Sequence, residues 1–260
     1  TLQSQGNYSL AEQFHQAALH HCTTLYSSTH PKTLDKTPNL ALALLGQKRY
    51  VQAHHLLSCV YQQSYAALGP HSPKTLRYLS NLAISLQLLG RWAEAHTHLV
   101  HAVNGYESAL GPTHVQTLQC KVNLAETYRQ HGDMCRAENV IRTVLQAHRE
   151  QLGAEHPISL HMLQNLRLVL MEQGRYGEAA QELVYVVRGR EEKLGGEHCE
   201  TLRAMLYLSD VYQKLGSQRE ALDLGRYVVD VRKRLLPESD SDRRESEAFV
   251  LELEQGQSLL

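Results

Sequence analysis

Alanine recurs at a fixed interval of 42 residues along this chain, at positions 11, 53, 95, 137, 179 and 221. Two leucine columns keep the same interval without any insertion or deletion. The first comprises Leu34, Leu76, Leu118, Leu160 and Leu202, and the second comprises Leu68, Leu110, Leu152, Leu194 and Leu236. A fixed period of this length is typical of repeat proteins, in which each unit packs only on its neighbours. The period therefore constrains the fold before any helix or strand is assigned.

Each repeat reads as two helices. In residues 72–111, Leu76, Leu79, Ala83 and Leu86 recur at spacings of three and four, which places them on one helical face. A second helix is predicted from about residue 92 to 110, and no strand pattern occurs anywhere. Turns are expected near Gly90, Gly111, Gly132, Gly153, Gly174, Gly195 and Gly216. Because a hairpin of this kind has a large, one-sided apolar face, neighbouring hairpins are expected to stack in an all-α fold.

Local departures from the repeat predict local differences in structure. Pro38 falls inside an expected helix, so that helix should begin late, with Thr37 as its cap, or be kinked. The glycine column is interrupted at Lys48, with a glycine two residues earlier at Gly46. The residues that precede the first helices are interpreted as N-caps, namely His30, Ser72, His156 and His198.

The repeat sequence resembles a known family. The stretches LGPTHVQTLQCKVNLAETYRQHG (110–132) and LGAEHPISLHMLQNLRLVLMEQGRYGEA (152–179) resemble the 42-residue tetratricopeptide repeat (TPR) of the kinesin light chain type. Such repeats also occur in arrays attached to STAND-class nucleotide-binding ATPases. The resemblance covers nearly the whole chain and implies a right-handed α-solenoid of stacked helical hairpins, the TPR superhelix.

The period also predicts how the chain is divided. A TPR array is expected over residues 1–236, followed by a C-terminal capping helix over residues 237–260. The array would consist of a half-repeat at 1–27 and five hairpins at about 30–68, 72–110, 114–152, 156–194 and 198–236. Terminal units with a more polar outer face are what a repeat array needs in order to end in water.

Composition and motifs argue against several functional classes. A formal net charge of −1 and a pI near 6.9 give no basic surface for nucleic acid or for an anionic membrane. Without a long apolar run or a signal peptide, a cytoplasmic location is expected. The five cysteines form no CxxC pair, and His96, His98 and His101 lack a completing carboxylate or thiol, so no metal or cofactor is expected. Phosphate-loop, nucleophile-elbow and zinc-protease motifs are missing, so no catalytic residue is assigned.

The predicted binding surface is the groove lined by the first helix of each hairpin. One repeat position carries the asparagine column, which consists of Asn39, Asn81, Asn123 and Asn165. By resemblance to peptide-binding TPR grooves, these amides would hold an extended peptide backbone; alternatively, they bond neighbouring hairpins together. Beside them the sequence places Arg77, Arg129, His161, Arg203 and Lys214. Acidic residues share the same helices, so the groove is predicted to be mixed in charge, although the cations would suit an acidic ligand.

The function predicted from the sequence is that of a non-catalytic scaffold that binds a protein or an extended peptide. One alternative is a sensor or autoinhibitory arm of a larger STAND-type ATPase or motor complex. A second alternative is an enzyme with a cavity in a helical-repeat fold. Self-association through exposed repeat ends is also open, because the ends of a stacked array can pair with each other.

Overall fold

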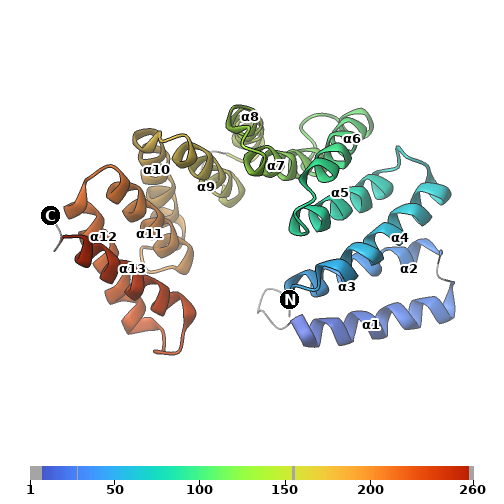
Figure 1. The fold of residues 1–260 in the computed structure, drawn as a ribbon, viewed down its shortest axis with the longest axis horizontal. Coiled ribbons are helices and arrows are strands. Elements are labelled where there is room, and N and C mark those ends of the chain that lie inside the picture. Colours follow the sequence, from blue (N-terminus) through green and yellow to red (C-terminus); the bar gives the residue numbers. More distant parts are fainter. Residues whose placement is uncertain (1–7, 28, 154–155, 258–260) are drawn as a thin grey trace. The chain divides into compact units, whose positions relative to one another are not determined.

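The computed structural model describes residues 8–27, 29–153 and 156–257, and within these ranges the regular structure is entirely helical (Figure 1). The helices described are α1 (Tyr8–Leu25), α2 (Pro31–Leu34), α3 (Thr37–Gly46), α4 (Tyr50–Leu68), α5 (Pro73–Leu88), α6 (Trp92–Leu110), α7 (Val115–Gln130), α8 (Met134–Leu152), α9 (Pro157–Glu172), α10 (Tyr176–Leu194), α11 (Cys199–Lys214), α12 (Gln218–Leu235) and α13 (Ser241–Gln257). The predicted all-α fold of stacked helical hairpins is confirmed.

The chain divides into two compact units, Thr1–Val140 and Ile141–Leu260, with the division inside α8. In the N-terminal unit, α1 packs on α3, and each helix from α3 to α6 packs on the next one, as far as α7. In the C-terminal unit, α9 to α13 pack in the same sequential way. Within the N-terminal unit the first helices of successive hairpins also touch, α3 with α5 and α5 with α7, so they share one face. We call this surface, and its equivalent on α9, α11 and α13, the first-helix face.

The alanine column forms part of the core. Ala53, Ala95, Ala137, Ala179 and Ala221 are each 0% exposed. Ala95, for example, belongs to a buried cluster with Leu79, Ala83, Leu86 and Leu99 from α5 and α6. A methyl group at this position lets the two helices of a hairpin approach closely, because nothing larger has to be accommodated between them. The column thus recurs for a packing reason.

Histidine caps begin several of the first helices. The Nδ1 atoms of His30, His114 and His198 each accept a hydrogen bond of 3.2 Å from the backbone N–H two residues later. This bond satisfies one of the donors that a helix N-terminus leaves free. Ser72 occupies the N-cap position of α5 as predicted, but its side chain makes no cap hydrogen bond.

The helix break at Pro38 is present. The chain forms a short helix, α2, then two turn residues, and resumes as α3 at Thr37, with Pro38 in its first turn. Proline is tolerated there because the first turn of a helix lacks acceptors for its N–H groups in any case. The cap residue is Lys36 rather than the predicted Thr37, whose hydroxyl instead donates to the Thr33 carbonyl at 3.4 Å.

The interruption of the glycine column has two separate causes. Lys48 occupies the turn where other repeats have glycine and adopts a positive φ of 61°. The glycine at position 46 serves a different contact, because a Cβ there would lie 2.3 Å from two ring carbons of Tyr8. Gly46 therefore makes room for α1, and Lys48 takes the left-handed turn without a glycine's freedom.

Candidate functional site

The asparagine column lies on the first-helix face, with Asn39, Asn81 and Asn123 in the N-terminal unit and Asn165 in the C-terminal unit. Asn39 is exposed, and the other three are half-buried. Asn81 also borders a narrow crevice between α3 and α5 that is otherwise lined by apolar side chains. The side chain of His161, predicted to belong to the same surface, lies outside the described residues.

Three amides of the column make no bond to the scaffold. Across the described part of the chain, the side chains of Asn81, Asn123 and Asn165 have no hydrogen-bond partner, although the backbone carbonyl of Asn123 accepts from Gln87 at 2.9 Å. An amide side chain can donate two hydrogen bonds and accept two. These groups are therefore available to water or to a ligand, and the alternative in which they bond the hairpins together gains no support from the contacts.

The predicted cation Arg77 is held in a charged network. Its guanidinium pairs with the Asp35 carboxylate at 2.5 Å, and that carboxylate also accepts from Lys74 at 2.8 Å and from the Tyr78 hydroxyl at 2.7 Å. Burial acts to raise the pKa of Asp35, but the bonds from Lys74 and Tyr78 outweigh it, so the pKa lies below its ordinary value. Burial raises the pKa of Tyr78 to about 12, and the bond to Asp35 acts in the same direction. The positive charge of Arg77 is thus neutralised within the fold.

Two other predicted cations are paired in the same way. Arg129 forms hydrogen bonds of 2.9 Å and 2.7 Å with both carboxylate oxygens of Glu126 on its own helix. Arg203 lies 3.0 Å from the carboxylate of Glu200. Lys214 is exposed at the end of α11. The structure consequently gathers no group of free cations on the described first-helix face.

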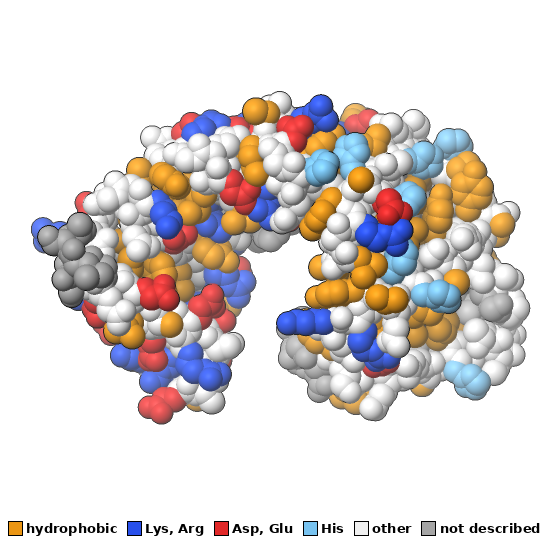
Figure 2. All heavy atoms as spheres, in the orientation of Figure 1, with side chains coloured by type: hydrophobic (Ala, Val, Ile, Leu, Met, Phe, Trp, Pro, Cys, Tyr) orange, Lys and Arg blue, Asp and Glu red, His pale blue; other side chains and the backbone are white. Residues whose placement is uncertain are grey.

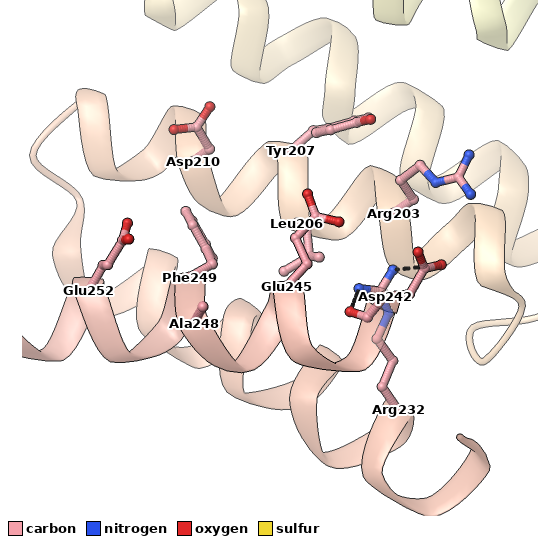
Figure 3. Close-up of a pocket in the computed structure, with 10 residues that line it drawn as sticks. All are labelled: Arg203, Leu206, Tyr207, Asp210, Arg232, Asp242, Glu245, Ala248, Phe249 and Glu252. Carbon is pink, nitrogen blue, oxygen red and sulfur yellow. Dashed lines mark hydrogen bonds and ion pairs between the residues drawn. The ribbon is translucent and has the colours of Figure 1, made fainter. Parts of the chain in front are cut away.

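A cavity in the C-terminal unit lies between α11 and α13 (Figure 3). Its volume is about 440 Å³. We call it the terminal pocket; it is lined by Arg203, Leu206, Tyr207, Asp210, Arg232, Asp242, Glu245, Ala248, Phe249 and Glu252. In Figure 3, Glu245, Phe249 and Glu252 project from α13 toward α11. Of the residues predicted for the site, only Arg203 lines this cavity.

Several charges of the terminal pocket are already engaged. Arg232 is 3% exposed and donates to the backbone carbonyl of Asp242 at 2.5 Å, with its carboxylate 3.8 Å away. Asp210 lies 3.9 Å from Arg167, whose guanidinium carbon stands 4.3 Å from the ring centroid of Tyr207. Burial lowers the pKa of Arg167, against the opposing effects of Tyr207 and Asp210. The guanidinium of Arg167 therefore already covers one face of the Tyr207 ring.

The histidine side chains that the structure describes do not assemble a metal site. Figure 2 shows the histidine side chains of this face over the N-terminal unit. His96 packs edge-on against Tyr128 with ring centroids 5.3 Å apart, and burial lowers the pKa of the half-buried His98. No group of three or more His, Cys, Asp or Glu side chains that could hold a metal ion occurs in residues 8–27, 29–153 and 156–257.

The helices are also unlike membrane spans. Within the described ranges, none of them has both the length and the apolar composition that crossing a bilayer requires.

Comparison with known proteins identifies the repeat. A sequence model of the tetratricopeptide repeat matches residues 34–108 and 74–147, and a second one matches residues 201–242, so that together they cover more than half of the chain. No curated protein sequence matches significantly. The structure is similar to that of the nearly identical TPR-like repeats of a Podosopora anserina kinesin light chain, with 26% identity, a TM-score of 0.73, and coverage of 79% of this chain and 97% of the other.

Two more distant structures share the fold. BtubC (BKLC) from P. vanneervenii is 15% identical with a TM-score of 0.75, over 90% of this chain and 96% of BtubC. NprR in complex with its cognate peptide NprX is 17% identical with a TM-score of 0.57, over 83% of this chain and 61% of NprR. At these identities the likeness shows the fold alone. The chain belongs to the tetratricopeptide repeat family, with an array that resembles the repeats of kinesin light chain.

Proposed function

We propose that this chain is a binding scaffold for an extended peptide or a protein segment, which it holds on the first-helix face. In the N-terminal unit the side chains of Asn81 and Asn123 would bond the ligand backbone. The observation that carries the proposal is that these two amides, at one position of consecutive repeats, are half-buried and have no bond within the described chain.

The physical argument concerns hydrogen bonds that the fold leaves unmade. Each peptide unit presents one donor and one acceptor, and both must be satisfied wherever the peptide loses water. An amide side chain offers both functions at one point, so it can pair with a backbone of any sequence. Amides repeated once per hairpin would thus hold a chain by its backbone, and the residues around them would select its side chains.

The comparison with NprR supports the same type of ligand. NprR, which shares the fold, is in complex with a cognate peptide. Fold similarity does not carry the identity of a ligand, so the support extends only to the class of ligand. Three of the predicted cations, Arg77, Arg129 and Arg203, add no preference for an acidic segment, because each is paired with a carboxylate.

The test uses peptides selected on the whole chain. A displayed library of random peptides is panned against the protein, and enriched peptides are synthesised and titrated by calorimetry. In the double variant Asn81→Ala/Asn123→Ala, two hydrogen bonds of about 1 kcal/mol each are lost, so the Kd should rise roughly thirtyfold. The melting temperature should stay the same, since neither amide has a partner in the fold.

The matched control is Asn104→Ala. Asn104 is an exposed asparagine on α6, a second helix, and its substitution should change neither affinity nor melting temperature. The proposal is wrong if the double variant binds the selected peptides with full affinity, if its melting temperature falls by several degrees, or if panning yields no peptide that binds.

A further inference from the structure

The terminal pocket combines a cavity with an apolar wall and an acidic rim. Its volume of about 440 Å³ lies within the range of roughly 300–1,000 Å³ that is usual for ligand pockets. Leu206, Tyr207, Ala248 and Phe249 provide the apolar part. Because Tyr207 already holds Arg167 against its ring, Phe249 is the aromatic ring left for a ligand.

The charge balance of the pocket is negative. Its two arginines are neutralised by neighbours, Arg203 by Glu200 at 3.0 Å and Arg232 by Asp242. Glu245 and Glu252 also line the pocket, both exposed, and neither has an ion pair or a hydrogen bond from its side chain anywhere in the described chain. Two carboxylates thus face the cavity without a counter-charge.

We infer that the terminal pocket binds an arginine side chain of a peptide ligand, with the guanidinium paired to one of the two carboxylates, Glu245 or Glu252, and its stem against Phe249, which lies between them on α13 (Figure 3). A guanidinium suits this lining because it is planar, donates two parallel hydrogen bonds to a carboxylate and packs on aromatic faces. An anionic side chain would meet two uncompensated carboxylates and only arginines that are already paired.

The inference rests on the proposed function in one respect, because it takes the ligand to be a peptide. The two fail separately. The asparagine test uses Asn81 and Asn123 of the N-terminal unit, whereas the test of the pocket uses residues of α13 and short probes that carry no other side-chain chemistry.

The probe is the capped peptide acetyl-Ala-Arg-Ala-amide, compared with the same peptide containing citrulline or glutamate. Citrulline keeps the shape of arginine but is neutral. Binding to the whole chain is followed by NMR through the ring signals of Phe249 and Tyr207. The arginine peptide should bind with a Kd on the order of millimolar, as expected for a single anchored side chain. It should bind at least about fivefold more tightly than the citrulline peptide, and 1 M salt should remove most of the difference.

In the variant Glu245→Gln/Glu252→Gln the preference for arginine over citrulline should disappear while the melting temperature stays the same. The control Glu191→Gln/Glu220→Gln removes two exposed carboxylates outside the pocket and should keep the preference. The inference is overturned if arginine and citrulline peptides bind equally to the unmodified protein, if the glutamate peptide binds better, or if the pocket variant keeps its preference. Absence of any shift in the ring signals at tens of millimolar arginine peptide would overturn it as well.

Discussion

Replacing Ala95 with leucine tests the packing on which the repeat depends. Ala95 is 0% exposed and is surrounded by Leu79, Ala83, Leu86 and Leu99. Leucine adds three carbon atoms at a point where α5 and α6 meet. If space were available, burying them would stabilise the fold by roughly 2 kcal/mol, at about 0.8 kcal/mol per buried CH₂.

The space is not available. The neighbours of Ala95 are themselves buried, and the cavities described lie elsewhere in the chain. The new atoms must push α5 away from α6 or force strained rotamers, and in comparable cores such overpacking gives a net destabilisation of about 1–3 kcal/mol with the hydrophobic gain already included. Strain therefore exceeds the hydrophobic gain, and the free energy of unfolding should fall by about 1–3 kcal/mol.

The measurement is urea unfolding followed by circular dichroism at 222 nm. Ala95→Leu should lower the midpoint with little change in slope, because the surface exposed on unfolding is nearly the same. Ala93→Leu is the control, since Ala93 is exposed on the same helix and the change there should stay within about 0.5 kcal/mol. An unchanged or higher midpoint for Ala95→Leu would refute the close approach of the two helices at the alanine column.

Four further results are expected. Because the pKa of Tyr78 is raised to about 12 in the folded chain, the stabilisation that comes from this shift is complete below pH 10 and is lost as the pH rises to about 12. Between pH 10 and 12 the free energy of unfolding should therefore fall less for Tyr78→Phe than for the unmodified protein, as measured by denaturant unfolding at each pH. Burial raises the pKa of Cys120 to about 11, so a thiol reagent at pH 7 should label the exposed Cys135 and leave Cys120 unlabelled until the chain unfolds. His114→Ala should lower stability by about 1 kcal/mol, and His114→Asn should restore most of it, because asparagine also caps. Lys48→Gly should raise the melting temperature by relieving a positive φ, worth about 1 kcal/mol.

The fold was predictable because its determinants are repeated and local. The alanine and leucine columns report the same helix contact in every hairpin, so a period of 42 residues reveals the architecture without knowledge of any single contact. Departures from the period depend on neighbours outside the repeat and were harder to interpret. Position 46 is a glycine because the ring of Tyr8 packs against it. Tyr8 lies 38 residues earlier in the sequence, in α1.

Pairing among the charged residues was not predictable from composition. The sequence suggested that Arg77 faces the groove as a cation, yet Asp35, the residue at the same repeat position one period earlier, neutralises it. One repeat column thus carries opposite charges in neighbouring repeats, and this is visible when the repeats of the chain are written under one another. The repeat columns do not show the conformation of each long side chain, and that conformation decides whether two such residues meet.

The terminal pocket shows how one repeat position can change its chemistry along the array. Continuing the columns past residue 236 places Glu245, Phe249 and Glu252 one period after Arg203, Tyr207 and Asp210. The asparagine of earlier repeats has become tyrosine and then phenylalanine, so a position that offers hydrogen bonds in the N-terminal unit offers aromatic rings here. The cavity itself was not predictable, because its volume depends on how α13 packs against α12 and on the rotamers of the side chains between α11 and α13. A scaffold that keeps its core columns constant can vary this face freely, and the two proposed contacts, a backbone held by amides and an arginine held by carboxylates, use the same kind of helix position in different repeats.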